Sequence, residues 1–263
     1  MSLTPLEFIT YYFEDSNKKE SRSIYNVYNS GGLINNIHPT ASLWECNHHK
    51  GWYNALVDNN GAKARQHFYV CGRLDEFVNH TFKKTESEKC FYHDFHLMNA
   101  LLSDCQPLVQ RYIKLKYPRM IDGLKKRNEG LFPQTLMSVL RQDWEVVDFV
   151  INRITNHKLK DDERYIAWRN YFTGLRHQQQ PQVEEALAAL LQPPVITRLN
   201  QNFLGWEKDL IVPQVVVFAK VAKLRGMDIA LNHPMIPNEL IDIKPNDEYD
   251  DLYDFLKTFK LTL

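Results

Sequence analysis

Histidine and cysteine side chains are common zinc ligands in proteins, and this sequence groups them at two places. The groups span positions 46–49 and 90–96, and their members are Cys46, His48 and His49, then Cys90, His93 and His96. Zinc needs about four converging nitrogen or sulfur ligands. Neither spacing matches a zinc finger or ribbon, and His48 and His49 would point in different directions on a helix. We therefore expect no metal site and no cofactor.

A second chemical possibility is RNA cleavage by an arginine and a histidine. Arg73 and His80 have the spacing of the Arg…His pair in helical ribonucleases of the higher eukaryote and prokaryote nucleotide-binding family. That chemistry needs a cationic arginine beside a histidine that acts as general acid or base. However, apolar Leu74 follows the arginine, where that family usually has a polar residue. A solvated helix face explains the pair without catalysis, and we favour that interpretation.

Paired carboxylates could supply a general acid and a general base, and they occur at Asp161–Glu163, Glu184–Glu185 and Asp250–Asp251. The first two groups precede or open predicted helices, where the helix dipole favours negative charge. Capping therefore explains them. The sequence also lacks a serine-hydrolase elbow, a phosphate-binding loop and a dinucleotide fingerprint. Together these observations predict that the protein is not an enzyme.

Composition limits the class of partner. The 263 residues include 32 basic and 32 acidic side chains, and 44% of the residues are hydrophobic. Such a chain can bury its own core, and its balanced charge argues against general binding of nucleic acid. Acidic residues occur too early for a secretory signal, and no window approaches the roughly 20 apolar residues of a membrane helix. We expect a cytoplasmic protein whose four cysteines are free thiols.

The elements that would position these residues are helices. One apolar stripe predicts a helix from Ala62 to about Phe82, and its members are Ala64, Phe68, Cys71, Leu74 and Val78. Residues 95–112 and 131–154 each fit a helix, a tight turn and a second helix. The two copies align at a constant offset of 39, with Leu97 matching Leu136 and Asp104 matching Asp143. That period is typical of stacked helical hairpins.

The later copy and the segment after it carry clear helix signals. Asp143 would cap a helix that buries three apolar side chains, Trp144, Val147 and Val150. An almost wholly apolar helix would begin at Pro213 and stop at Gly226. The basic residues of its last turn are Lys220, Lys223 and Arg225.

These signals predict an all-α protein of antiparallel helical hairpins stacked in a repeat-like array. Ile229–Leu231 is at most one short strand, because no alternating apolar and polar run is long enough for a sheet. We expect a single domain over residues 1–263. Its parts would be an N-terminal helical part of about 1–88, a hairpin part of about 90–241 and an acidic helix of about 242–263.

The acidic segment is the charge feature with a functional interpretation. We expect a short helix there, with an inner face of Leu252, Tyr253, Phe255, Leu256 and Phe259. An acidic surface can steer a basic partner and cover its active cleft, whereas the alternative is a solvated face that aids solubility. The candidate partner-binding residues are Asp242, Asp247, Glu248, Asp250, Asp251 and Asp254.

Between about Cys90 and Ile241 the sequence resembles the immunity protein 49 family of bacterial polymorphic toxin systems. The matching pieces, in order, are the hairpin Leu97–Tyr112, the helix start Asp143–Glu145, the apolar helix Val183–Leu191 and the block Val212–Ile241. The resemblance implies a protein that binds a cognate toxin and blocks it in the producing cell. Such proteins usually work by surface complementarity and need no cofactor. The alternative is a helical-repeat scaffold or adaptor that binds a host protein or peptide.

Overall fold

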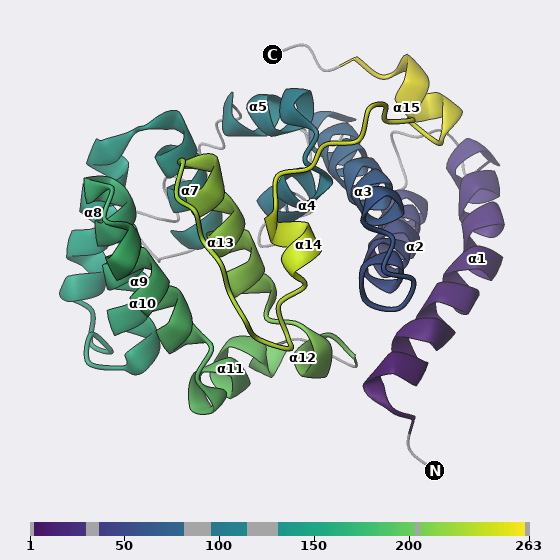
Figure 1. Cartoon of the computed structure of the whole chain (residues 1–263). Helices are drawn as coiled ribbons and strands as arrows, with labels where there is room; N and C mark the ends of the chain where they lie inside the picture. The colour runs from purple at the N-terminus through teal and green to yellow at the C-terminus, as the bar shows by residue number, and fades with distance from the viewer. Residues whose placement is uncertain (1–2, 30–36, 82–95, 115–130, 203–205, 261–263) are drawn as a thin grey trace. The chain divides into compact units, whose positions relative to one another are not determined.

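In a computed structural model of this chain, the regular secondary structure of the described residues is helical (Figure 1). The structure describes residues 3–29, 37–81, 96–114, 131–202 and 206–260. Within these ranges no strand forms, even at Ile229–Leu231, where buried and exposed side chains alternate. A strand requires a hydrogen-bonded neighbour, and no other described segment pairs with this one. The predicted all-α class is confirmed.

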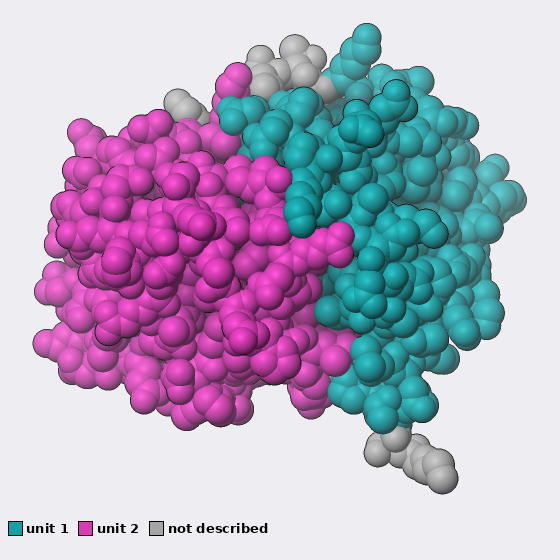
Figure 2. Space-filling view, in the orientation of Figure 1, with its two compact units in different colours: residues 1–112, 244–263 teal, residues 113–243 magenta. Residues whose placement is uncertain are grey.

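The chain divides into two compact units, which Figure 2 shows in different colours. Unit 1 comprises Met1–Tyr112 together with Lys244–Leu263, and unit 2 comprises Ile113–Ile243. The acidic segment that we expected to be a separate part therefore belongs with the N-terminal helices. That the whole chain forms a single domain stays a prediction.

Unit 1 is built on three long helices that pack on one another in chain order. Its helices are α1 (Pro5–Asn29), α2 (Ile37–Leu56), α3 (Gly61–Thr81), α4 (His96–Ser103), α5 (Gln106–Lys114) and α15 (Asp254–Thr258). The helix predicted from Ala62 to about Phe82 is α3, and every member of its apolar stripe is buried. Trp52 of α2 meets Phe68 of α3 edge to face, with ring centroids 5.1 Å apart. Part of the core of unit 1 therefore lies between α2 and α3.

Unit 2 is organised around α13, as its apolar sequence predicts. Its helices are α7 (Leu131–Arg141), α8 (Trp144–Thr155), α9 (Glu163–His177), α10 (Gln180–Leu190), α11 (Pro193–Leu199), α12 (Glu207–Leu210), α13 (Pro213–Leu224) and α14 (Asn238–Ile241). Pro213 lies in the first turn of α13, and Gly226 follows its end with a φ of 85°. Phe218 stacks on Tyr171 of α9, with ring centroids 4.2 Å apart. Both predicted helix signals are confirmed.

Lys220 is a basic residue that we placed in the last turn of α13 but that lies inside unit 2. Its side chain is fully buried. The ammonium group donates hydrogen bonds to the carbonyl oxygens of Leu240, at 2.9 Å, and Asp242, at 2.8 Å. A buried ammonium group must be hydrogen-bonded, and these carbonyls at the end of α14 meet that need. Lys220 therefore fastens α14 to α13.

The two predicted hairpins form, as α4–α5 and α7–α8. The offset of 39 holds along the first helices but slips by one residue at the turns. The left-handed residue is Asp104 in the first hairpin, with a φ of 58°, and Gln142 in the second, with a φ of 61°. The first hairpin belongs to unit 1 and the second to unit 2. Their stacking in a repeat-like array stays a prediction.

Two details of the second hairpin differ from expectation. Asp143 occupies the N-cap position of α8, but its side chain makes no capping hydrogen bond. Val147 and Val150 are buried, whereas Trp144 is only half-buried. Its ring instead lies against the guanidinium groups of Arg176 and Arg225, whose central carbons are 5.3 and 5.4 Å from the ring centroid. Cation–π contact explains why this tryptophan can stay near the surface.

The close packing of α9 on α10 depends on Gly174. A Cβ atom there would lie 2.7 Å from Cγ2 of Val183 and 3.2 Å from the carbonyl oxygen of Gln179. We expect Gly174→Ala to lower the free energy of unfolding by about 1–2 kcal/mol, because overpacking outweighs the better helix propensity of alanine. Urea denaturation measures this change. The same substitution in a Val183→Ala background should have a smaller effect, and an equal effect would contradict the steric explanation.

Candidate partner-binding site

The acidic C-terminal segment is mostly extended, not helical. We call residues 244–259 the strap. Only Asp254–Thr258 are helical, so the helix predicted over about residues 242–263 is wrong for its first part. Acidic side chains three or four positions apart would repel one another on a helix, and those of the strap are Asp247, Asp250, Asp251 and Asp254. Of the predicted inner face, Tyr253, Phe255 and Leu256 are buried and Phe259 is half-buried, but Leu252 is 39% exposed.

Side chains of α3 hold the first half of the strap. Arg65 donates to the side-chain oxygen of Asn246 at 3.2 Å, and Asn246 donates to the carbonyl oxygen of Ala62 at 2.8 Å. The amide of Gln66 binds both backbone groups of Asp250, with distances of 2.7 and 3.1 Å. Because α3 satisfies these polar groups, the strap keeps a defined path without forming a helix.

Arg73 of α3 binds the second half of the strap. Its guanidinium group binds the carboxylate of Asp251 through two hydrogen bonds, of 2.9 and 3.1 Å. It also donates to Glu76 at 2.6 Å, and Glu76 accepts a bond of 2.7 Å from Arg111. Burial alone would lower the pKa of Arg73, but the bonds to Asp251 and Glu76 outweigh it and hold the pKa above its usual value. The hydroxyl of Tyr69 donates to Asp251 at 2.9 Å and completes this ion-pair network.

A second polar network holds Tyr253 between α1, α2 and α3. The tyrosine hydroxyl donates to Glu20 at 2.5 Å and accepts from Asn47 at 2.6 Å. Lys50 binds the other oxygen of Glu20 at 2.6 Å, and a ring nitrogen of His67 lies 2.9 Å from Asn47. Burial would raise the pKa of Glu20, but the bonds from Lys50 and Tyr253 lower it. Burial lowers the pKa of His67 to about 4, so the network joins a charged pair to a histidine that is neutral at pH 7.

The six predicted partner-binding residues differ in their surroundings. Asp242 belongs to unit 2, where Lys223 binds its carboxylate at 2.9 Å. Asp251 points inward to Arg73, so its carboxylate is already neutralised. Asp254 is exposed beside Lys257, with an N···O distance of 3.3 Å. Their role in binding stays a prediction, but Asp242 and Asp251 have structural partners that the sequence did not indicate.

The other three predicted residues form the exposed acidic part of the strap. Asp247, Glu248 and Asp250 are exposed, and none of the three forms an ion pair with any residue that the structure describes. Leu252 is exposed two positions further along. The sequence of unit 1 contains 17 acidic and 14 basic residues, whereas the sequence of unit 2 contains 15 acidic and 18 basic residues. The negative charge of the strap therefore lies on the more acidic unit.

The histidine and cysteine groups also have structural roles. In the described ranges, no three His, Cys, Asp or Glu side chains converge as a metal site would require. A ring nitrogen of His49 lies 3.1 Å from the hydroxyl of Ser16, and His48 stacks on Trp44. Burial raises the pKa of the Cys46 thiol to about 11, so it is protonated at neutral pH. Cys90 and His93 lie outside the described residues, as does the side chain of His96.

Two of the remaining catalytic candidates, Arg73 and Asp162, have structural roles. Arg73 binds the strap, and the side chain of His80 lies outside the described part of α3. Asp162 caps α9 by accepting a bond of 3.0 Å from the backbone of Arg164, as expected. However, α10 begins at Gln180, so Glu184–Glu185 lie in its interior and do not open it.

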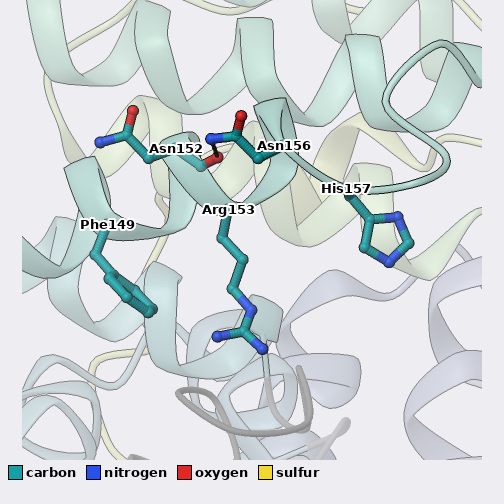
Figure 3. A pocket seen from close by; sticks show the side chains of 5 residues that line it. All are labelled: Phe149, Asn152, Arg153, Asn156 and His157. Carbon is teal, nitrogen blue, oxygen red and sulfur yellow. Dashed lines mark hydrogen bonds between the residues drawn. The ribbon is translucent and has the colours of Figure 1, made fainter.

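A pocket that sequence reasoning missed lies along α8 (Figure 3). Its volume is 380 Å³, and it is lined by Phe149, Asn152, Arg153, Asn156 and His157. Figure 3 shows Phe149, Arg153 and His157 pointing to one side of the helix, as their spacing of four residues requires. The Arg153 guanidinium carbon is 5.9 Å from the Phe149 ring centroid. The spacing of four residues in the sequence could have indicated that these side chains share one face of α8. Such spacing is common on exposed helix faces, however, so it does not by itself predict a pocket.

Comparison of the chain with protein-family models, curated proteins and solved structures gave no match. Each helix in the described ranges is either too short or too polar to cross a bilayer.

Proposed function

We propose that this protein is an immunity protein that binds and neutralises a cognate bacterial toxin in the cytoplasm by surface complementarity, without catalysis. The resemblance of residues 90–241 to the immunity protein 49 family supports a role in a polymorphic toxin system and in competition between bacteria. The observation that carries the proposal is the strap, which holds Asp247, Glu248 and Asp250 outward without ion-pair partners among the described residues.

The strap is suited to binding because its conformation is set before a partner arrives. Bonds to Asn246, Asp250, Asp251 and Tyr253 hold it on the helices of unit 1. Ordering a flexible loop on binding opposes association, so a pre-organised segment binds more tightly than a mobile one with the same side chains. The acidic side chains then meet a partner in a fixed arrangement.

Charge gives the strap a preference for basic partners. Exposed carboxylates attract a basic surface over roughly 8 Å at physiological salt and speed association more than they raise affinity. Toxins that attack nucleic acid often have basic active clefts, which an acidic segment can cover. Exposed Leu252 adds an apolar contact beside the acidic residues.

The first test reverses the charge of the exposed acidic residues. We expect the triple substitution of Asp247, Glu248 and Asp250 by lysine to slow association with the toxin domain encoded beside this gene by about 10- to 100-fold at low salt. Stopped-flow mixing measures the rate, and survival of cells that co-express the toxin measures neutralisation. Asp251 is left intact, because its loss would also release Arg73.

A matched variant controls for net charge. Substitution of Glu185, Asp209 and Glu239 by lysine changes the net charge by the same amount, but on exposed residues of unit 2. We expect this control to keep nearly the wild-type association rate and to protect cells. Equal slowing in both variants would show that the strap is not the binding surface.

A further inference from the structure

The inward face of the strap packs on an apolar surface of unit 1, which we call the groove. The groove is lined by buried residues of α1, α2 and α3, which are Val27, Leu43, Val70, Leu74, Phe77 and Val78. Tyr253, Phe255 and Leu256 of the strap pack into this cluster. The rings of Phe77 and Phe255 are 5.0 Å apart, and Figure 1 shows α15 beside the C-terminal end of α1. Three apolar or aromatic side chains of one short segment therefore enter one groove.

Polar groups of the groove recognise the same segment at both ends. Arg73 binds the carboxylate of Asp251 with two bonds, and its guanidinium group also donates to the carbonyl oxygens of Leu256, at 3.2 Å, and Phe259, at 3.1 Å. A planar guanidinium group that grips a carboxylate with two bonds is selective for that group. Arg73 thus fixes both the start of the segment and the end of α15.

Polar side chains of the groove also bind the hydroxyl group of Tyr253. The hydroxyl of Tyr253 is bonded to Glu20 and Asn47, which would lose a partner if the hydroxyl were absent. A site built to bind a hydroxyl group rejects an analogue without it, because its buried polar groups are left unpaired. The groove therefore binds an acidic residue, Asp251, a tyrosine two positions later, Tyr253, and the apolar pair Phe255–Leu256.

The helices that form the groove also pack directly on one another. α1 packs on α2, and α2 packs on α3. The strap reaches them only after the chain has passed through unit 2, and Arg73 and Asp251 are 178 positions apart. The segment is thus held in the groove as a tethered ligand would be.

We infer that this groove is a peptide-binding site for an acidic–aromatic segment, that residues 251–259 occupy it within one molecule, and that the same segment of a second copy of this chain can occupy it instead. Exchange of an identical segment between copies recreates every contact, so its free-energy cost is small. The inference goes beyond the proposed function, because it concerns the inward face of the strap and needs no toxin.

The test uses a fluorescently labelled peptide with the sequence of residues 246–260. The full-length protein with Tyr253→Phe has a weakened segment of its own and should bind this peptide at least 10-fold more tightly than the wild-type protein, in which the intact tethered segment competes. Fluorescence anisotropy measures the affinity. Full-length protein with Asp250→Asn, whose carboxylate points outward, serves as the control and should behave like the wild type.

Two further measurements make the inference falsifiable. The peptide should raise the melting temperature of the Tyr253→Phe protein, and a peptide with Asp251→Lys and Tyr253→Ala should neither bind nor stabilise. Light scattering of concentrated wild-type protein should show dimers. The fraction of dimer should be smaller for the Tyr253→Phe protein. Absence of peptide binding, equal binding of the altered peptide, or a wild-type protein that stays monomeric at every concentration would overturn the inference.

Discussion

Replacing Glu76 with leucine is expected to lower the free energy of unfolding by about 3–5 kcal/mol. The side chain of Glu76 is fully buried and accepts hydrogen bonds from Arg73 at 2.6 Å and Arg111 at 2.7 Å. Leucine would fill the space but leave two guanidinium groups without that carboxylate. Removing one partner of a buried ion pair is far more destabilising than the net contribution of the pair, because the remaining charge stays desolvated. Urea denaturation monitored by circular dichroism measures the loss.

An exposed ion pair of the same unit provides the control. The side chains of Asp254 and Lys257 are 85% and 51% exposed, so Asp254→Asn should change the stability by no more than about 0.5 kcal/mol. A comparable loss in the two variants would mean that burial does not set the strength of these pairs. A small loss for Glu76→Leu alone would mean that Arg73 and Arg111 find other partners.

Acidification from pH 7 to pH 5 is expected to lower the free energy of unfolding by up to about 2 kcal/mol for each of two histidines. Burial, assisted by His48 and Lys19, lowers the pKa of His49 to about 3. Burial, assisted by Lys50, lowers the pKa of His67 to about 4. Both rings stay neutral in the folded protein at pH 5, whereas the unfolded chain protonates them below about pH 6.5. The unfolded state therefore binds more protons, and stability falls as the pH falls from about 6.5 towards 4.

Substitution of the two histidines tests this origin of the pH dependence. His49→Gln and His67→Gln keep a polar side chain but remove the titrating ring. Each substitution should reduce the difference in unfolding free energy between pH 7 and pH 5 by about the amount that the replaced histidine contributes. Urea denaturation of the double variant at both pH values gives the combined effect. An unchanged difference would assign the acid sensitivity to other groups.

Helix positions could be predicted because their signals are local. The apolar stripe of α3 repeats at helical spacing, and Pro213 and Gly226 mark the ends of α13 through their own backbone preferences. The turn at Asp104 could likewise be predicted, because Pro107 three positions later favours the start of a new helix. In each case the information lies within a few residues, so no knowledge of distant parts of the chain is needed.

The strap and Lys220 could not be predicted because their partners are distant in sequence. Composition indicates that acidic residues are exposed, and this is right for Asp247, Glu248 and Asp250. Nothing near Asp251 indicates that it binds Arg73, 178 positions earlier. Lys220 has the local sequence of a basic helix end, but the carbonyl groups of Leu240 and Asp242 make its burial possible. Local charge patterns therefore identify acidic residues but not which of them are neutralised.

Unit 1 is interrupted in the chain, and this affects when it can be completed during synthesis. Its first 112 residues leave the ribosome early, but Asp251 and Tyr253 follow only after all of unit 2 has been translated. Until then, the apolar groove between α1 and α3 stays uncovered, and Arg73 lacks one of its carboxylates. Domains generally fold as units while the chain emerges, but the contacts of the strap with α1, α2 and α3 can form only after unit 2 has been translated. A polypeptide truncated within unit 2 would expose that groove to proteases and chaperones, which distinguishes unfinished chains from finished ones.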